Sequence, residues 1–145
     1  HVILTAFIPM LMDTGGNSGS QSSVTIIRAI SLGEVEFTDI GKVILKEFMT
    51  SLMCGLALSA ACFAKVMLVD GLLFQNESVT FMVAFSVSLT MCLTVVIAKL
   101  IGCTLPLVAK KIGFDPAVMA SPFITTIVDA LSLLIYFAIA TAILF

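Results

Sequence analysis

The most informative property of this sequence is how little charge it carries. Only 11% of its 145 residues are Asp, Glu, Lys or Arg, whereas 60% are hydrophobic. Soluble domains carry about 25% charged residues, so this chain has too few polar side chains to cover a globule in water. The composition therefore predicts a protein whose solvent is the lipid bilayer.

Three further absences narrow the class of function. No cluster of basic residues is present, and the net charge of −2 does not favour nucleic-acid binding. The four cysteines form neither a CxxC pair nor a Cys/His metal motif, which indicates small buried hydrophobic residues rather than a redox or zinc site. Because no GxxxxGK[ST] loop for nucleotide phosphates occurs, a pump built into the chain is not predicted.

Long apolar runs alternate with short polar segments, which predicts an all-α membrane protein, a single bundle of transmembrane helices over 1–145. A helix that spans the membrane needs about 20 mostly apolar residues. The segments 40–70, 78–109 and 117–145 meet this requirement. The connection before the last segment, "KKIGFDP", contains a glycine turn and an Asp-Pro helix start.

The first 32 residues differ because a polar run divides them. "DTGGNSGSQ" at positions 13–21 separates two apolar arms that are each too short to span a membrane. Gly15 and Gly16 disfavour a regular helix, and Pro9 loosens the arm before them. Residues 1–32 are therefore predicted to form a discontinuous transmembrane helix with an unwound middle. The alternative is a glycine-rich kink that serves only close helix packing.

The positions of lysine and arginine predict the orientation of the helices. Arg28, Lys42 and Lys46 flank the connection at 33–41, and Lys110 and Lys111 lie in the connection before the last segment, whereas the connection at 70–77 has no basic residue. By the positive-inside rule, the two basic connections are cytoplasmic and the C-terminus is extracytoplasmic. Lys65 and Lys99 lie in apolar runs near their ends, and the favoured interpretation is that each amine extends to the membrane surface.

The last apolar segment carries an acidic residue at membrane depth. Asp129 lies about 12 residues, or about 18 Å, from the predicted cytoplasmic start of its helix. A carboxylate there costs roughly 2.5–3.5 kcal/mol, and such residues usually serve a function. It belongs to a polar stripe on one helix face, made of Ser121, Thr125, Asp129, Ser132 and Tyr136. The alternative is an Asp that is neutral or bonded to neighbouring hydroxyls in the bundle interior.

The polar run near the N-terminus is predicted to lie at the same depth as Asp129. Gly16 is about 24 Å of helix from the cytoplasmic end of its segment. Unwound backbone there exposes carbonyl oxygens, Asn17, Ser20 and Gln21 add side-chain oxygens, and Asp13 adds a second carboxylate. Such oxygens are typical ligands of a hard cation such as Mg²⁺, Mn²⁺ or Ca²⁺. The residues predicted to form the metal site are Asp129, Gly15, Gly16, Asn17, Gln21, Thr125, Ser121 and Asp13.

Three motifs stand out together: "PMLMDTGGNSGSQSS", "IRAISLGE" and "DPAVMASPFITTIVDALSLLIYF". They resemble the transmembrane domain of the bacterial MgtE magnesium channels. The resemblance covers essentially the whole chain. It implies a homodimer in the bacterial inner membrane, with the ion path along the dimer axis. It also implies that Asp129 holds hydrated Mg²⁺ and that the glycine motif falls on Gly15, Gly16, Asn17, Gly19 and Gln21.

The resemblance also implies parts that this chain does not supply. Family members have five transmembrane helices preceded by cytosolic regulatory domains that sense Mg²⁺, whereas four spanning elements and no such domains are expected here. The predicted function is a passive Mg²⁺-selective channel rather than an enzyme. One alternative is a transporter that exchanges Mg²⁺ or another divalent cation for Na⁺ or H⁺, since discontinuous helices are typical of transporters. Another is a structural membrane subunit in which Asp129 is a packing group.

Overall fold

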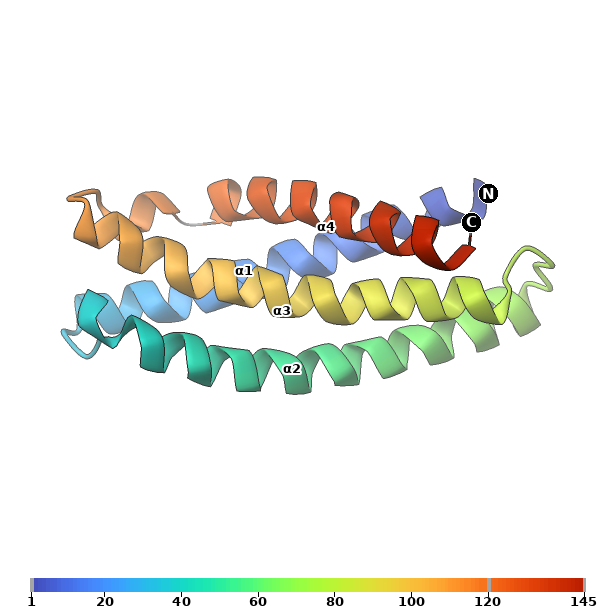
Figure 1. The fold of residues 1–145 in the computed structure, drawn as a ribbon, viewed down its shortest axis with the longest axis horizontal. Helices are drawn as coiled ribbons and strands as arrows, with labels where there is room; N and C mark the ends of the chain where they lie inside the picture. The colour runs from blue at the N-terminus through green and yellow to red at the C-terminus, as the bar shows by residue number, and fades with distance from the viewer. Residues whose placement is uncertain (1, 120, 145) are drawn as a thin grey trace.

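The computed structural model describes residues 2–119 and 121–144, which form an up-and-down bundle of four long helices (Figure 1). The long helices are α1 (Ile8–Ser31), α2 (Ile40–Lys65), α3 (Phe81–Lys111) and α4 (Ser121–Leu144). Short helical segments precede or join them: the 3₁₀ segments η1 (Val2–Phe7), before α1, η2 (Phe37–Asp39) and η4 (Pro116–Met119), and the π-helical η3 (Val66–Leu73). Since the described residues contain no strand, the prediction of an all-α bundle is confirmed.

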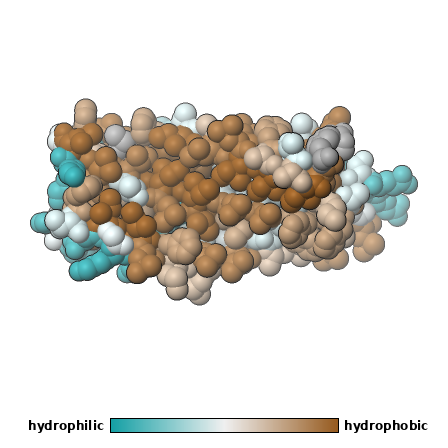
Figure 2. Space-filling model, in the orientation of Figure 1, coloured by the Kyte–Doolittle hydropathy of each residue, from teal (hydrophilic) through white to brown (hydrophobic). Residues whose placement is uncertain are grey.

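The lengths and surface of the helices fit a membrane protein. Within the described ranges, three helical stretches are long and apolar enough to cross a membrane: Phe37–Leu73, Phe81–Lys111 and Pro122–Leu144. They correspond to the three predicted spanning segments. Figure 2 shows apolar side chains over the middle of the visible face, with hydrophilic side chains gathered at its two ends. This band is what a bilayer core about 30 Å thick requires.

The connections divide the bundle into two chemically different ends. The α1–α2 and α3–α4 connections lie at one end, and the α2–α3 connection lies at the other with both chain termini (Figure 1). We call the first of these ends the basic end, because the helix termini that meet there are rich in Lys and Arg. Its basic residues are Arg28, Lys42, Lys46, Lys110 and Lys111.

Glycine turns end α1 and α3 at the basic end. Gly33 and Gly113 have φ angles of +73° and +86°. Such angles favour glycine, because the Cβ of any other residue would clash with the backbone there. In each turn the residue after the glycine donates its N–H back to the helix, from Glu34 to Ala29 and from Phe114 to Ala109. These bonds satisfy carbonyls that a helix end otherwise leaves open. The glycine turn predicted in "KKIGFDP" is therefore confirmed.

Helix α3 is the centre of the bundle because it packs against α1, α2 and α4. Small residues allow close contacts: a Cβ at Gly55 of α2 would lie 3.0 Å from the carbonyl oxygen of Cys92. A Cβ at Gly102 of α3 would collide with the carbonyl oxygen of Gly19 in α1. At the end opposite the basic end, the buried Tyr136 hydroxyl donates to the carbonyl of Leu4 at 2.9 Å, which ties α4 to η1.

The predicted interruption of the first helix is wrong, because α1 is continuous from Ile8 to Ser31. Pro9 lies in its first turn, where a missing N–H costs nothing. Glycine inside a helix costs about 1 kcal/mol relative to alanine, but here the glycines permit contacts that no other residue allows. A Cβ at Gly15 would lie 2.6 Å from Cγ2 of Thr94, and one at Gly19 would lie 3.0 Å from the carbonyl oxygen of Ala98. Close packing of α1 therefore outweighs the local preference of these glycines.

Candidate functional site

The structure places Asp129 beside the glycines of α1. A Cβ at Gly16 would lie 3.7 Å from Oδ1 of Asp129 and 3.1 Å from Cγ2 of Thr125. The Asp129 side chain is half-buried at the edge of the α1–α4 contact. The prediction that Gly16 and Asp129 lie at the same level is thus confirmed, although α1 reaches this level as an unbroken helix.

The polar residues of α1 form a stripe on its exposed face. Asp13, Asn17 and Gln21 are four residues apart, so a helix places them in one row, and all three are exposed in the single chain. Asp13 is near enough to Asp129 to interact with it electrostatically. We call Asp13, Asn17 and Gln21 the α1 stripe. Because α1 is helical, side-chain oxygens rather than unwound carbonyls are the oxygens that this segment presents.

The remaining predicted residues divide between the site and the packing. Gly15 is buried against Thr94, Val128 and Ser132, so it serves packing between helices. Thr125 is half-buried, and its hydroxyl donates to the carbonyl of Pro122 at 3.0 Å. The side chain of Ser121 lies outside the described residues.

The polar stripe predicted on α4 also divides. Ser132 and Tyr136 are buried and turn into the bundle, where Ser132 donates to the carbonyl of Val128 at 2.7 Å. Asp129 and Thr125 remain at the edge of α4, facing the same side as Gly16. The face of α4 that can meet an ion is therefore shorter than the sequence pattern indicated.

Asp129 has no positive partner in the described part of the chain. The three ion pairs found there involve Asp39, Asp70 and Glu47 instead. The described ranges also contain no group of three or more His, Cys, Asp or Glu side chains arranged to hold a metal ion directly. What a single chain offers at this place is one half-buried carboxylate with Asp13 nearby, while the two amides of the α1 stripe are exposed on the helix that carries Gly16.

Comparison with known proteins identifies the family. Residues 8–139 match the family model of MgtE, which is described as a divalent cation transporter. The chain belongs to the MgtE family. It is 38% identical over 141 residues to the magnesium transporter MgtE of Bacillus subtilis, which covers 97% of this chain. It is 35% identical over 139 residues to that of Enterococcus faecalis and 35% identical over 141 residues to that of Thermus thermophilus.

These MgtE relatives are much longer than the aligned region. The match covers 96% to 97% of this chain but 29% to 30% of each of the three relatives. The chain therefore spans about three tenths of the MgtE proteins it matches. The family match contains the glycines of α1 and the part of α4 up to residue 139.

This MgtE chain also contains a mostly buried ion pair that the sequence analysis did not predict. Lys99 does not extend to the membrane surface as predicted, because its amine lies 2.9 Å from Oε1 of Glu47 and its side chain is 14% exposed. Ser22 of α1 joins the pair. A signal was available, since Lys99 and Glu47 lie at or near long apolar runs in which charges are costly without a partner. Lys65 is different: it is 48% exposed and pairs with Asp70 at 2.7 Å.

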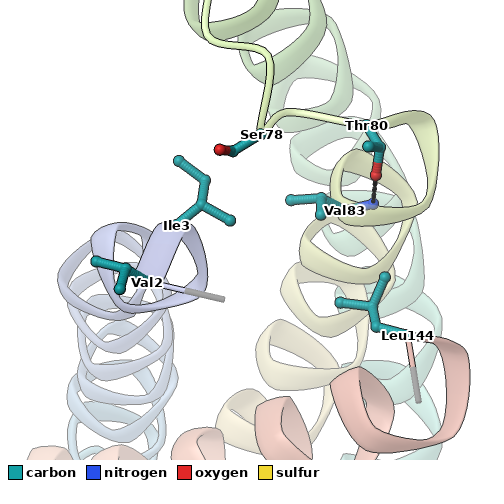
Figure 3. A pocket seen from close by; sticks show the side chains of 6 residues that line it. All are labelled: Val2, Ile3, Ser78, Thr80, Val83 and Leu144. Atoms are coloured by element: carbon teal, nitrogen blue, oxygen red, sulfur yellow. Dashed lines mark hydrogen bonds between the residues drawn. The ribbon is translucent and has the colours of Figure 1, made fainter.

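A pocket of about 520 Å³ opens at the end of the bundle that carries the chain termini (Figure 3). Its lining residues are Val2, Ile3, Ser78, Thr80, Val83 and Leu144. Thr80 is the N-cap of α3, where its hydroxyl accepts the N–H of Val83 at 3.3 Å. None of the six lining side chains is charged, so this pocket adds no charged ligand for a cation.

Proposed function

We propose that this chain is the membrane part of a Mg²⁺-selective channel. The observation that carries the proposal is the position of Asp129, a half-buried carboxylate beside Gly16 that has no cationic partner in the described ranges. A carboxylate without a counter-charge is costly at membrane depth, and a bound cation supplies the missing charge. The family and the names of the relatives support a divalent cation, and Mg²⁺ in particular.

The ion is expected to keep most of its water. Mg²⁺ dehydrates reluctantly and typically binds through one or two carboxylates while retaining several waters. Asp129 attracts the hydrated ion, and the exposed side chains of Asn17 and Gln21 offer oxygens that accept hydrogen bonds from its waters. Mn²⁺ and Ca²⁺ take oxygen ligands of the same kind. We therefore expect selectivity to depend on how the hydrated ion fits between the helices.

Two copies of the chain in the bacterial inner membrane would enclose this path. The α1 stripe is exposed in the single chain, and polar groups at membrane depth need protein or a water-filled cavity beside them. In a homodimer the two stripes and the two Asp129 side chains would face a common aqueous path. The basic end of the bundle would then be cytoplasmic, where cytosolic regulatory domains connect, and the C-terminus extracytoplasmic.

Passive uptake needs no further source of energy. A divalent ion that moves inward gains about 4.6 kcal/mol per 100 mV of inside-negative potential, twice the value for a single charge. The protein therefore acts as a transport protein that lowers the barrier for the ion, without an enzymatic step.

The substitution Asp129→Asn tests this function, because it removes the charge and keeps the shape. In proteoliposomes with an inside-negative potential and a trapped Mg²⁺ dye, we expect uptake to fall about 100-fold, the equivalent of about 2.7 kcal/mol of lost binding. Glu77→Gln is the matched control, since it makes the same change in the exposed α2–α3 connection. Unchanged uptake in a folded Asp129→Asn protein would remove Asp129 from the ion path.

The same liposomes separate a channel from an exchanger. A channel conducts Mg²⁺ without Na⁺ and without a pH gradient, whereas an exchanger requires one of them. The discontinuous first helix that favoured an exchanger is not present, since α1 is unbroken. If uptake strictly required a counter-ion gradient, the exchanger would replace the channel as the function of this site.

A further inference from the structure

Three polar side chains from three different helices meet inside the apolar part of the bundle. The amine of Lys99 in α3 donates to Oε1 of Glu47 in α2 at 2.9 Å and to the hydroxyl of Ser22 in α1 at 3.2 Å. The Ser22 hydroxyl in turn donates to the Glu47 carboxylate. We call Ser22, Glu47 and Lys99 the triad. Each member contacts the other two, so the triad is a closed ring of interactions.

The triad lies at membrane depth and is mostly shielded from solvent. Glu47 is about 7 residues, or about 10 Å, from the start of α2, and Lys99 is about 12 residues, or about 18 Å, from the end of α3. Lys99 is 14% exposed and Glu47 is 19% exposed. Because a charge left alone at such a depth is costly, each of the two holds the other in place. The triad therefore constrains the three helices more strongly than an exposed ion pair does.

The position of Ser22 on α1 links this constraint to the ion path. At about 100° per residue, Asp13, Asn17 and Gln21 fall within an arc of about 80°, and Ser22 lies about 140° from the centre of that arc. The triad therefore holds the back of α1, while the α1 stripe occupies the front. The tight contact of Gly19 with Gly102 lies one turn away on the same side as Ser22.

We propose that the triad sets the rotation of α1 about its axis and so keeps Asn17 and Gln21 turned toward the ion path. Ser22, Glu47 and Lys99 are positioning residues, because they act through α1 and do not touch the ion. This inference rests on the proposed function only in that the α1 stripe is taken to face an ion path. The rotation itself is a property of the helices and can be measured without any transport.

The first test measures the direction in which position 17 faces. Asn17→Cys is made in a background where Cys54, Cys62, Cys92 and Cys103 are replaced by Ala, in the protein at its natural length and in proteoliposomes. We expect Lys99→Met to slow labelling of the thiol introduced at position 17 by a membrane-impermeant maleimide about fivefold or more. Lys99→Arg keeps a charged donor, so its labelling rate at position 17 is expected to equal that of the protein with Lys99 unchanged.

Lys65→Met is the matched control for this experiment. It also breaks a close Lys–carboxylate pair, but Lys65 and Asp70 belong to one continuous helical stretch, α2 and η3. The Lys65 amine also lies 5.8 Å from the centre of the Phe7 ring in η1, which is at the start of α1 and away from the part that carries position 17. Its labelling rate at position 17 is expected to stay unchanged. Equal slowing by Lys65→Met and Lys99→Met would overturn the proposal, as would an unchanged rate in the folded Lys99→Met protein.

A double variant covers the case in which Lys99→Met fails to fold. Glu47→Gln with Lys99→Met leaves no unpaired charge and still removes the triad, so slow labelling is expected again. Mg²⁺ uptake is measured in parallel and is expected to fall in Lys99→Met and recover in Lys99→Arg. If the parent protein takes up no Mg²⁺, the proposed function fails while the labelling still decides whether the triad orients α1. If uptake falls but labelling does not change, the orienting role is wrong.

Discussion

Glu47 and Asp129 both lie in membrane-spanning helices of this protein, and their surroundings are opposite. Glu47 is 19% exposed and bonds to the amine of Lys99 and the hydroxyl of Ser22. Asp129 is half-buried and has no cationic partner in the described ranges, although the α1 stripe lies near it. Glu47 is thus neutralised by the protein, whereas Asp129 leaves a negative charge that a mobile cation can neutralise.

The difference teaches how this bundle separates structure from function. A carboxylate with an internal partner stabilises the packing and has little to offer a ligand. A carboxylate without a partner costs stability and offers affinity, which is the usual trade-off at a functional site. The following experiments test this division between Glu47 and Asp129.

The largest expected effect is on folding stability. Glu47→Gln leaves the amine of Lys99 unpaired, and the free energy of unfolding should fall by about 3 kcal/mol. Asp129→Asn removes a charge that has no partner, so its free energy of unfolding should stay within about 0.5 kcal/mol of the parent value or rise. Both are measured by denaturant titration of the detergent-solubilised protein without Mg²⁺. If Asp129→Asn were as unstable as Glu47→Gln, Asp129 would be a packing group.

The second effect concerns stabilisation by the ion. At a Mg²⁺ concentration of about 100 times Kd, the folded state should gain about 2.7 kcal/mol. This gain should be absent in Asp129→Asn and present in Glu47→Gln, because the proposed function assigns the ion to Asp129 and not to Glu47. Thermal unfolding with and without Mg²⁺ measures it. The division between the two carboxylates is wrong if both variants keep the gain or both lose it.

A charge exchange should sharpen the structural role of Glu47. In the double variant Glu47→Lys with Lys99→Glu the pair is reversed but retained. We expect it to recover about 2 kcal/mol relative to the sum of the two single substitutions, as contacting residues couple. The double-mutant cycle in denaturant provides the measurement. Simple additivity would mean that Glu47 and Lys99 stabilise the bundle independently.

The smallest effect is expected at the neutral member of the triad. Ser22→Ala removes a hydroxyl that bonds to both charges, which should cost about 1 kcal/mol. Ser31→Ala is the control, because the Ser31 hydroxyl is exposed and donates only to the carbonyl of Ile27 in its own helix. The control should change the free energy of unfolding by less than about 0.5 kcal/mol. Equal costs would show that Ser22 contributes no more than a local bond.

The sequence predicted those features that depend on local composition. The length of an apolar run and the position of a glycine turn are properties of short segments, so the three long spans and the turn at Gly113 could be predicted from the sequence. That Gly16 and Asp129 lie at the same depth could also be predicted, because depth can be counted in residues along a helix from its charged end.

The remaining features depend on contacts between distant segments. Gly15 and Gly19 disfavour a helix locally, but their contacts with Thr94 and Ala98 reverse that preference, and one sequence does not reveal such contacts. Lys99 was misplaced for the same reason, since Glu47 is 52 residues away and Ser22 is 77 residues away along the chain. Pairing across helices requires the fold itself.

The contact between Gly19 and Gly102 limits how this bundle can change shape. Where two helix backbones touch directly, no layer of side chains lies between them that could repack as the helices slide. Sliding of α1 along α3 is therefore resisted at this point, whereas rotation of α1 about its own axis is not fixed by this contact alone. In the proposed channel, we expect an opening or closing of the path to involve tilting of α1 together with α3, or displacement of α4 against them.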